Sequence, residues 1–592
     1  MPQWLRHHLL IVALATPILF FRLGEARLWD RDEPRNAQCV VEMLARGDWV
    51  VPYFNDELRT HKPVLLYWLI MSAYAVFGVN EFAARFWSAA LGVGTVLCTY
   101  HLGRRLFSPR AGLWAALALA PALMFDVASR AATPDAPLIF CLTATLCAYI
   151  HFAFPSPKAA DGEPRFSSSV WAGLIVYGLM ALAVLAKGPV GVVLPLAIMA
   201  ASLWSLRCLS WDTAVARQDD VKATVQQEWL CTLRVRLVEP LKQLVAVARE
   251  LQPLTALVML LLIAVPWYAW VGWRTEGEFL LGFFWDHNIR RATESMEGHT
   301  GPAILFYPAT LLVGFFPASV FLVPALLQVR GQVSESRRQA AAIVFCLTWI
   351  VVVVGLFSLA KTKLPSYVTP CYPALAVLVG NVIQRWIAGN LIISERWLRW
   401  SMATIITAGL AATLSIKLLT DRYLPGDGWL SSIGLVLVVG GCSAIACEFW
   451  LRSPAKAAAV SFGSGLLFSL LLFGLGPTAA DRHQQSHLLL GTLRDSQPEE
   501  IAAWRCMEPS WVFYLGRPIR ELEEWREAVE FISHDHRTLI IRAEDYANLA
   551  GRLPADVEVL GESPRFLRDE TLLTLGRRTD GLSRRPVESM RR

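Results

Sequence analysis

The sequence predicts an all-α polytopic membrane protein with about thirteen transmembrane helices, followed by a small C-terminal α/β domain. Of its 592 residues, 55% are hydrophobic and 18% are charged, whereas soluble domains average about 45–50% apolar and about 25% charged residues. The apolar residues gather in blocks of about 18–25 residues, which is long enough to cross a hydrocarbon core of roughly 30 Å. These blocks stop at residue 476, and a polar, mixed sequence follows.

Thirteen apolar blocks define the expected transmembrane domain of residues 1–476. The first block follows Arg6, His7 and His8, but no small-residue cleavage site comes after it, so it is expected to remain as the first helix. An odd number of spans places the two termini on opposite sides of the membrane. The expected spans are 8–23, 83–103, 111–129, 135–153, 169–186, 189–206, 254–273, 302–327, 340–359, 367–387, 398–418, 429–450 and 457–476.

Lysine and arginine residues set the expected orientation, because cytoplasmic loops retain positive charge. A cytoplasmic N-terminus puts the first loop, 24–82, and the C-terminal domain, 477–592, on the extracytoplasmic side. The segment His61–Gly78 is apolar but short, and counting it as a span would reverse this arrangement, so an interfacial helix is expected there. The basic residues then fall in cytoplasmic loops at Arg104, Arg105, Arg110, Lys158, Arg165, the 207–250 segment, Arg330, Arg337, Arg338, Arg452 and Lys456. The first loop is also basic, which calls for a functional explanation.

The C-terminal region 477–592 is polar and mixed in composition, and a small α/β domain is expected there. An amphipathic helix is expected around Glu521–Ser533, a strand over Arg537–Arg542 and a disordered tail over Arg577–Arg592. The net charge of +6 is small for this length, and no basic stripe indicates a nucleic-acid partner. The 11 cysteines include no metal-finger spacing.

Carboxylates are concentrated in the expected outer loops. Asp32 and Glu33 follow the first helix, and a carboxylate at a water–lipid boundary can act as a general base or hold a metal. The alternative is a solvated loop with local ion pairs. Asp135 stands at the head of an apolar helix, where a carboxylate is costly and its default interpretation is functional. Capping of that helix is the competing explanation.

Cationic side chains lie in the same loops. Lys62 heads the interfacial helix, and Lys361 and Lys363 interrupt the apolar sequence between two spans, which suits an anionic lipid head group such as a phosphate. Snorkelling to lipid head groups is the alternative for the lysines. His287 and Arg290 or Arg291 share a helix face. Histidine with arginine suits phosphate, and histidine alone suits a metal, although a lone histidine is more often neither.

These residues resemble the bacterial aminoarabinose transferases and the protein O-mannosyltransferases of the C-type glycosyltransferase (GT-C) superfamily. The resemblance covers roughly residues 1–380. Its motifs are Asp32-Glu33-x-Arg35, Gly47-Asp48-Trp49-Val50-Val51-Pro52, Lys62-Pro63, Tyr67-Trp68, Asp135, Lys187-Gly188, His287 to Arg291, and Lys361-x-Lys363-Leu364-Pro365-Ser366-Tyr367 followed by Pro370 and Pro373.

The resemblance implies an enzyme of the inner or plasma membrane that moves a sugar from an undecaprenyl- or dolichyl-type phosphate. The acceptor is a lipid such as lipid A, a protein or another glycan. Asp32 is then the essential carboxylate, accompanied by Glu33 and Asp135. The donor phosphate is expected to be held by Arg35, Lys62, Arg290, Lys361, Lys363 and Tyr367. The rival class is a secondary transporter or lipid flippase, for which inverted repeats and mid-membrane charges would be expected.

The sequence departs from the aminoarabinose transferase pattern at His61, where glutamate is expected before Lys-Pro. In that family the position helps to hold a divalent metal together with a histidine that His287 matches. Histidine also binds zinc, so His61 and His287 remain a candidate site for Zn, Mg or Mn.

Overall fold

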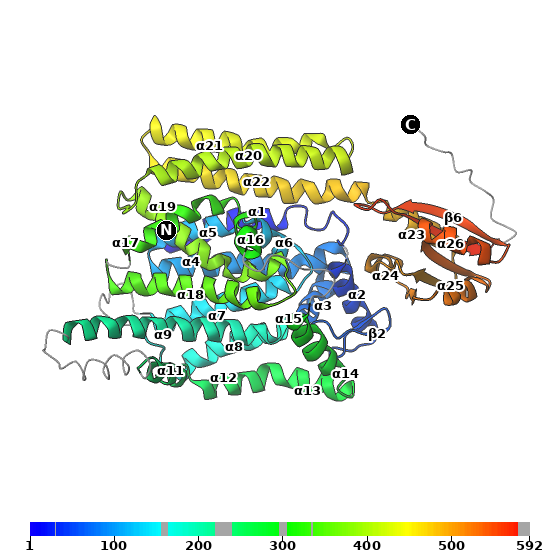
Figure 1. The fold of residues 1–592 in the computed structure, drawn as a ribbon, viewed down its shortest axis with the longest axis horizontal. Coiled ribbons are helices and arrows are strands. Elements are labelled where there is room, and N and C mark those ends of the chain that lie inside the picture. The colour runs from blue at the N-terminus through cyan, green and yellow to red at the C-terminus, as the bar shows by residue number, and fades with distance from the viewer. Residues whose placement is uncertain (30, 155–163, 219–238, 295–304, 333–334, 578–592) are drawn as a thin grey trace, which may run out of the picture.

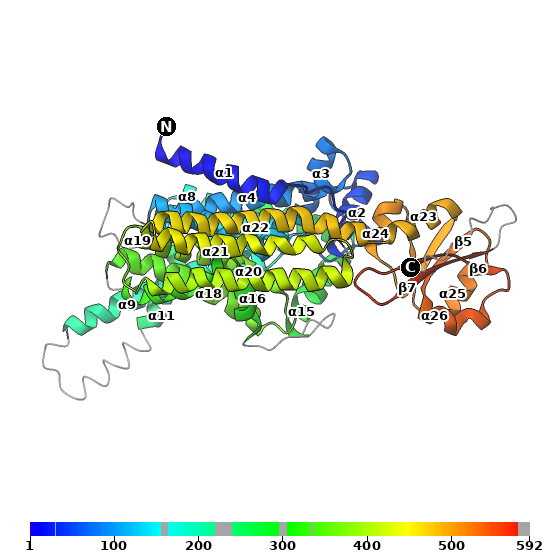
Figure 2. The same ribbon diagram turned by 90° about the horizontal axis from the view of Figure 1, so that it is seen from above.

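The computed structural model describes residues 1–29, 31–154, 164–218, 239–294, 305–332 and 335–577. Long helices lie side by side along one direction, and a smaller domain of strands and helices sits beyond one end of the bundle (Figures 1 and 2). The long helices of the bundle include α4 (Glu81–Leu106), α7 (Asp135–Ala153), α8 (Val170–Lys187), α9 (Val190–Gln218), α18 (Arg337–Leu359), α19 (Tyr372–Ile387), α20 (Arg396–Tyr423), α21 (Ile433–Phe449) and α22 (Pro454–His483).

The helix content confirms the predicted polytopic membrane fold. In the described ranges, ten helices are long and apolar enough to cross a membrane, or twelve if each of two bent pairs is one span. The sequence predicted about thirteen. The additional one is α1 (Gln3–Phe20), an 18-residue helix that is not among the twelve but packs against α4 and α22.

Two expected spans are broken rather than continuous, which corrects the prediction. Helix α5 (Pro109–Leu119) meets α6 (Leu123–Arg130) at 71°, and α16 (Phe306–Gly314) meets the Ala318–Gln332 segment, which includes α17 (Leu322–Gln332), at 112°. Pro121 and Pro317 lie in the two breaks. Proline lacks an amide hydrogen and clashes with the preceding helical turn, so each interrupts the helix.

The remaining helices of the bundle are short. Helix α13 continues α12 through a π-helical segment, Leu260–Ala264, and the three together make one span. The bounds are α11 (Glu239–Glu250), α12 (Pro253–Met259), α13 (Val265–Arg274), α14 (Glu278–Leu280) and α15 (Arg291–Thr293).

The first loop forms a compact layer at the end of the bundle nearest the C-terminal domain (Figure 1). It contains α2 (Asp32–Ala45), the hairpin β1 (Tyr53–Phe54) and β2 (Glu57–Leu58), and α3 (Leu65–Phe77). The 13 residues of α3 span about 20 Å at 1.5 Å per residue. The helix is therefore too short to cross the membrane, in agreement with the interfacial helix expected over this segment.

The C-terminal domain is a five-stranded mixed sheet in the order β4-β3-β5-β7-β6 with four helices. Strand β5 has the predicted bounds Arg537–Arg542, and the predicted amphipathic helix is the shorter α25. Helix α22 continues past the expected boundary at 476, and the predicted disordered tail lies almost wholly outside the described residues. The elements are α23 (Ser486–Ser496), β3 (Glu500–Trp504), α24 (Pro509–Leu515), β4 (Arg520–Leu522), α25 (Trp525–Ile532), β5, α26 (Ala543–Leu549), β6 (Val557–Pro564) and β7 (Thr571–Arg577).

Specific hydrogen bonds dock this domain onto the first loop. The Tyr514 hydroxyl accepts from the Leu28 amide at 2.7 Å and donates to Glu81 Oε1 at 3.0 Å. Asn55 exchanges two hydrogen bonds of 2.8 Å with the backbone of Ile519. The C-terminal domain is thus held against the same loop that carries Asp32.

Candidate active site

One cavity of about 610 Å³ lies where the first loop, the bundle and the C-terminal domain meet. This volume is in the range of small-molecule sites. Part of its wall carries both carboxylates and cations, and another part is apolar. The polar lining includes Arg31, Asp32, Arg35, His61, Lys62, Asp135, Lys187, His287, Arg291, Tyr367 and Arg568, and the apolar lining includes Leu138, Ile139, Val190, Phe283 and Phe357.

Asp32 and Glu33 are neighbours in sequence but occupy opposite environments. Asp32 is the first residue of α2 and lines the cavity, and its exposed carboxylate has no hydrogen-bond partner in the described part of the chain. Glu33 points the other way and is only 5% exposed. The Asp32 carboxylate is therefore available for chemistry, whereas the Glu33 carboxylate is buried and has a structural role.

Glu33 is bound by Arg85 and by two backbone amides. Arg85 donates to both carboxylate oxygens, at 2.8 and 2.7 Å, and the amides of Trp29 and Ala132 each donate at 2.8 Å. Burial alone would raise the pKa of Glu33, but Arg85 and the two amides hold it below its usual value. Arg85 also donates to the carbonyls of Leu23, Ala26 and Arg27. This Glu33–Arg85 clamp ties the loop before Asp32 to α4 and to the turn before Asp135.

A second buried arginine fixes the segment that carries Lys62. Arg59 is 4% exposed and donates to the Tyr67 hydroxyl and to the Asn36 side chain, both at 3.0 Å. Asn36 in turn donates to the Ala132 carbonyl at 2.9 Å. These bonds hold the loop before α3 against α2, which positions the neighbouring Lys62 on the cavity wall.

Asp135 and Lys187 face each other as an ion pair inside the cavity. Asp135 begins α7 and Lys187 ends α8. Gly188 follows with a φ of +78°, and a Cβ there would meet the Phe283 ring at 2.4 Å, so the turn requires glycine. The Lys187 ammonium also lies 5.5 Å from the centre of the Tyr367 ring. Asp135 is therefore a paired group rather than a free base.

Lys62 and Arg291 supply unneutralised positive charge. Neither makes a hydrogen bond or ion pair with its side chain in the described residues, and Arg291 Nε is buried without a partner. Burial and then the charge of Lys187 lower the pKa of Lys62 to about 8, although Asp32 and Asp135 act in the opposite direction. The cavity thus holds cations that lack protein partners, which favours an anionic ligand.

The rings of His61 and His287 lie on the cavity wall with centres 3.9 Å apart and planes inclined by 31°. Burial and then Arg59 lower the pKa of His61 to about 2, while burial and then Lys62 lower the pKa of His287. Both rings are therefore neutral near pH 7. A ligand nitrogen must point to a metal about 2.0–2.1 Å away in the ring plane. Two ring planes inclined by 31° with centres this close do not point both nitrogens at one ion, and no group of three or more His, Cys, Asp and Glu side chains in the described chain is arranged to hold a metal. The arrangement does not fit the metal that the resemblance implied.

Four of the predicted site residues lie away from the cavity. Glu33 is buried in the clamp, and Lys361 is exposed outside the lining. Lys363 is buried, and its ammonium donates to the carbonyls of Ser358 and Ala360 at 2.9 and 3.1 Å. Arg290 is exposed and pairs with Glu294 at 2.8 Å. The other predicted residues, Asp32, Arg35, His61, Lys62, Asp135, His287 and Tyr367, all line the cavity.

Sequence reasoning left four cationic residues of the cavity out of the predicted site. Lys187 and Arg291 lie in motifs that the resemblance covers, and Arg291 is adjacent to the predicted Arg290. Arg31 directly precedes Asp32. Arg568 belongs to the C-terminal domain and has no local motif, so only the three-dimensional docking brings it to the cavity.

Comparisons with known proteins agree with this fold. Residues 9–277 match the family of dolichyl-phosphate-mannose-protein mannosyltransferases. The chain superimposes on the crystal structure of ArnT from Cupriavidus metallidurans bound to undecaprenyl phosphate with a TM-score of 0.69 and 21% identity, covering 96% of this chain and 97% of that one. The apo structure of the same protein gives a TM-score of 0.71 and 22% identity. The architecture is that of a GT-C membrane glycosyltransferase.

Sequence similarity places the chain within this class. It is 31% identical over 468 residues to the undecaprenyl phosphate-alpha-4-amino-4-deoxy-L-arabinose arabinosyl transferase of Pseudomonas aeruginosa strain LESB58, covering 78% of this chain and 73% of that protein. An Edwardsiella ictaluri protein of the same description is 31% identical over 368 residues, which cover 61% of this chain and 57% of that one. The chain belongs to this family of polyprenyl-phosphate-dependent glycosyltransferases. The transporter or flippase alternative finds no support.

Proposed function

We propose that the protein transfers a sugar from a polyprenyl-phosphate donor, of the undecaprenyl-phosphate type, to an extracytoplasmic acceptor such as lipid A or a protein. The observation that carries this function is the convergence of Asp32, Lys62 and the Asp135–Lys187 pair on one cavity. That cavity lies at the end of the bundle where the C-terminal domain docks. The GT-C architecture and the family of its relatives support the same reaction.

The donor phosphate lies against Lys62, Arg35 and Arg291 in this proposal. The first isoprene units contact the apolar wall formed by residues such as Leu138, Val190 and Phe283. Phosphate is the leaving group, and its negative charge grows as the bond to the anomeric carbon breaks. Cations already fixed beside that charge lower the barrier without further reorganisation.

Asp32 acts on the acceptor. Its carboxylate has no protein partner, so it is free to orient the acceptor oxygen or to remove a proton from a hydroxyl acceptor. A single displacement at the anomeric carbon forms the new glycosidic bond, releases polyprenyl phosphate and inverts the carbon. Asp135 holds Lys187 in place and so shapes the positive wall. No step uses a metal, because the two imidazoles do not form a suitable ligand set.

The protein is a polytopic membrane protein, and we assign it to the inner or plasma membrane with the N-terminus in the cytoplasm. The C-terminal domain and the cavity then face the extracytoplasmic side. The basic loops at the opposite end of the bundle, with Arg104, Arg105 and Arg338, support this orientation.

The direct test is to replace Asp32 with Asn in the full-length protein, reconstituted in lipid, and to measure transfer from an undecaprenyl-phosphate sugar. Turnover is expected to fall by about 10²–10⁴-fold, the usual contribution of a positioned acid–base group. Asp56→Asn is the matched control, because Asp56 is an exposed carboxylate of the same loop whose ion-pair partner among the described residues is the surface residue Arg46. Wild-type turnover by the Asp32 variant would refute the assigned role.

A further inference from the structure

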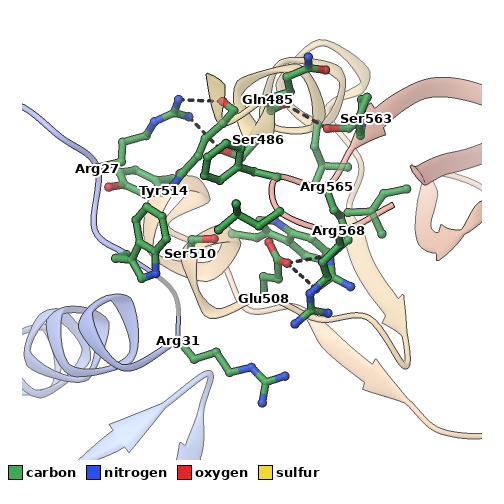
Figure 3. A pocket seen from close by; sticks show the side chains of 18 of the residues that line it. Arg27, Arg31, Gln485, Ser486, Glu508, Ser510, Tyr514, Ser563, Arg565 and Arg568 are labelled. Atoms are coloured by element: carbon green, nitrogen blue, oxygen red, sulfur yellow. Dashed lines mark hydrogen bonds and ion pairs between the residues drawn. The ribbon is translucent and has the colours of Figure 1, made fainter. Parts of the chain in front are cut away.

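A second, smaller pocket of about 290 Å³ lies between the first loop and the C-terminal domain (Figure 3). One wall is the segment Arg27–Arg31, which leads into the cavity residue Asp32. The opposite wall is formed by α23, α24 and the connection between β6 and β7. Only two lining residues, Arg31 and Arg568, also line the membrane cavity. The two pockets therefore meet at a pair of arginines.

The arginines of this pocket fall into two groups. Arg27 pairs with Asp481 at 3.0 Å and donates to Ser486 at 2.9 Å. Arg565 pairs with Glu508 and Glu570, at 2.5 and 2.7 Å. These two are neutralised, and they hold the walls together.

Arg31 and Arg568 differ from the paired arginines, since neither side chain has a hydrogen bond or ion pair within the described chain. In Figure 3, no dashed line joins Arg31 to any other residue drawn. Both side chains are exposed, and both line the small pocket and the membrane cavity, so an anion at the junction of the two pockets faces two guanidinium groups. A guanidinium presents a planar set of donors that matches phosphate oxygens.

The rim of the small pocket also suits a lipid. Trp29 and Leu567 are exposed apolar side chains, and the Trp29 ring makes an edge contact with Phe566 at 6.2 Å between centres. Leu567 has a φ of +63°, so the connection between β6 and β7 holds a strained residue beside Arg568. An amphipathic ligand could place its apolar part on this rim and its anionic group between the arginines.

We propose that Arg31 and Arg568 form a second anion site that holds a phosphate group of a lipid acceptor beside Asp32. The site rests on the function proposed above, because it supplies the acceptor for that reaction. It lies where the small pocket joins the membrane cavity, whereas Lys62 and Arg291, which hold the donor phosphate, line the membrane cavity alone. The C-terminal domain thereby contributes directly to acceptor selection.

The test measures binding and does not require turnover. The full-length protein in detergent is first titrated with undecaprenyl phosphate, and the saturated protein is then titrated with diphosphorylated lipid A or its dephosphorylated form. We expect wild-type protein to bind the phosphorylated lipid at least tenfold more tightly. Arg31→Gln and Arg568→Gln should each weaken that binding about tenfold and leave undecaprenyl phosphate binding within twofold.

Arg526→Gln is the matched control, because Arg526 is an exposed arginine of the C-terminal domain that lies 5.5 Å from the Trp525 ring and lines neither pocket. Weakened undecaprenyl phosphate binding in the Arg31 and Arg568 variants would assign the anion to the donor and overturn the proposal. Equal binding of the two lipid A forms by wild-type protein would also overturn it. Failure of the proposed function has a different signature, namely no sugar transfer by wild-type protein whatever its lipid binding.

Discussion

The Glu33–Arg85 clamp and the adjoining cavity use the same kinds of side chain for opposite purposes. In the clamp, the carboxylate accepts four hydrogen bonds and the guanidinium reaches three carbonyls, so every charge has protein partners. In the cavity, Asp32 and Lys62 have no such partners. Charges that are fully paired within the protein therefore stabilise this site, whereas charges without protein partners are available to bind the ligand. Stability and substrate binding should therefore respond to different substitutions.

The largest expected effect is the loss of the clamp. Arg85→Ala leaves the Glu33 carboxylate buried without its ion-pair partner, which typically costs about 3–5 kcal/mol. The thermal unfolding temperature of the purified protein should fall clearly, and transfer activity should fall with it because the Asp32 loop loses its anchor. Arg46→Ala is the control, since its exposed pair with Asp56 should contribute only about 0–1 kcal/mol. Equal unfolding temperatures for the two variants would contradict the distinction between clamp and surface pair.

A cavity cation should behave in the reverse way. Lys62→Met removes an unpaired, half-buried ammonium, so the unfolding temperature should stay the same or rise. Affinity for undecaprenyl phosphate should fall about 10–100-fold, as expected for the loss of a hydrogen bond between charged groups worth about 1.5–3 kcal/mol. A binding titration beside a thermal unfolding curve checks both parts. A marked loss of stability with intact binding would assign Lys62 to the scaffold.

The clamp and the cavity also differ in how far the sequence could predict them. Asp32, Lys62 and Asp135 were predicted because each interrupts or borders apolar sequence, where an isolated charge needs a reason. Glu33 carries the same local signal as Asp32. One residue along a helix turns the side chain by about 100°, and only the packing of α4 decides which of the two faces the cavity. The resemblance implied that Asp32 is the essential carboxylate, but it still placed Glu33 beside it in the catalytic group.

The predictions that did not hold depended on tertiary packing. The broken spans contain Pro121 and Pro317, which are visible in the sequence, but the bend angles follow from how the half-helices pack. Lys363 is buried and bound to the backbone of its own loop, whereas Lys187, on another helix, faces Asp135. Arg568 reaches the cavity through docking of a separate domain. The membrane fold itself was predictable, because apolar block length is set by bilayer thickness.

The Lys62 charge makes donor binding depend on pH. With its pKa lowered to about 8, the lysine of the free protein loses its proton as the pH rises through that value. The phosphate of undecaprenyl phosphate is already doubly ionised there, since its second pKa is about 6. Affinity should therefore fall severalfold between pH 7 and pH 9, and binding at pH 9 should take up a proton. Lys62→Arg should flatten this dependence, because arginine stays charged. An identical pH profile for this variant would exclude Lys62 as the titrating group.

The smallest expected effect concerns the imidazoles of His61 and His287, whose geometry differs from that of a metal site. Because the centres of the His61 and His287 rings lie 3.9 Å apart with their planes inclined by 31°, their nitrogens do not converge on one ion. Protein that has been treated with a chelator and then separated from the chelator should transfer sugar at a rate within twofold of that of untreated protein. His61→Glu restores the carboxylate expected at this position in the aminoarabinose transferase pattern, next to His287, and should raise zinc affinity relative to wild type in a direct titration. Loss of wild-type transfer on chelation, with recovery on adding zinc, would mean that the rings rotate to form a site that their present geometry does not provide.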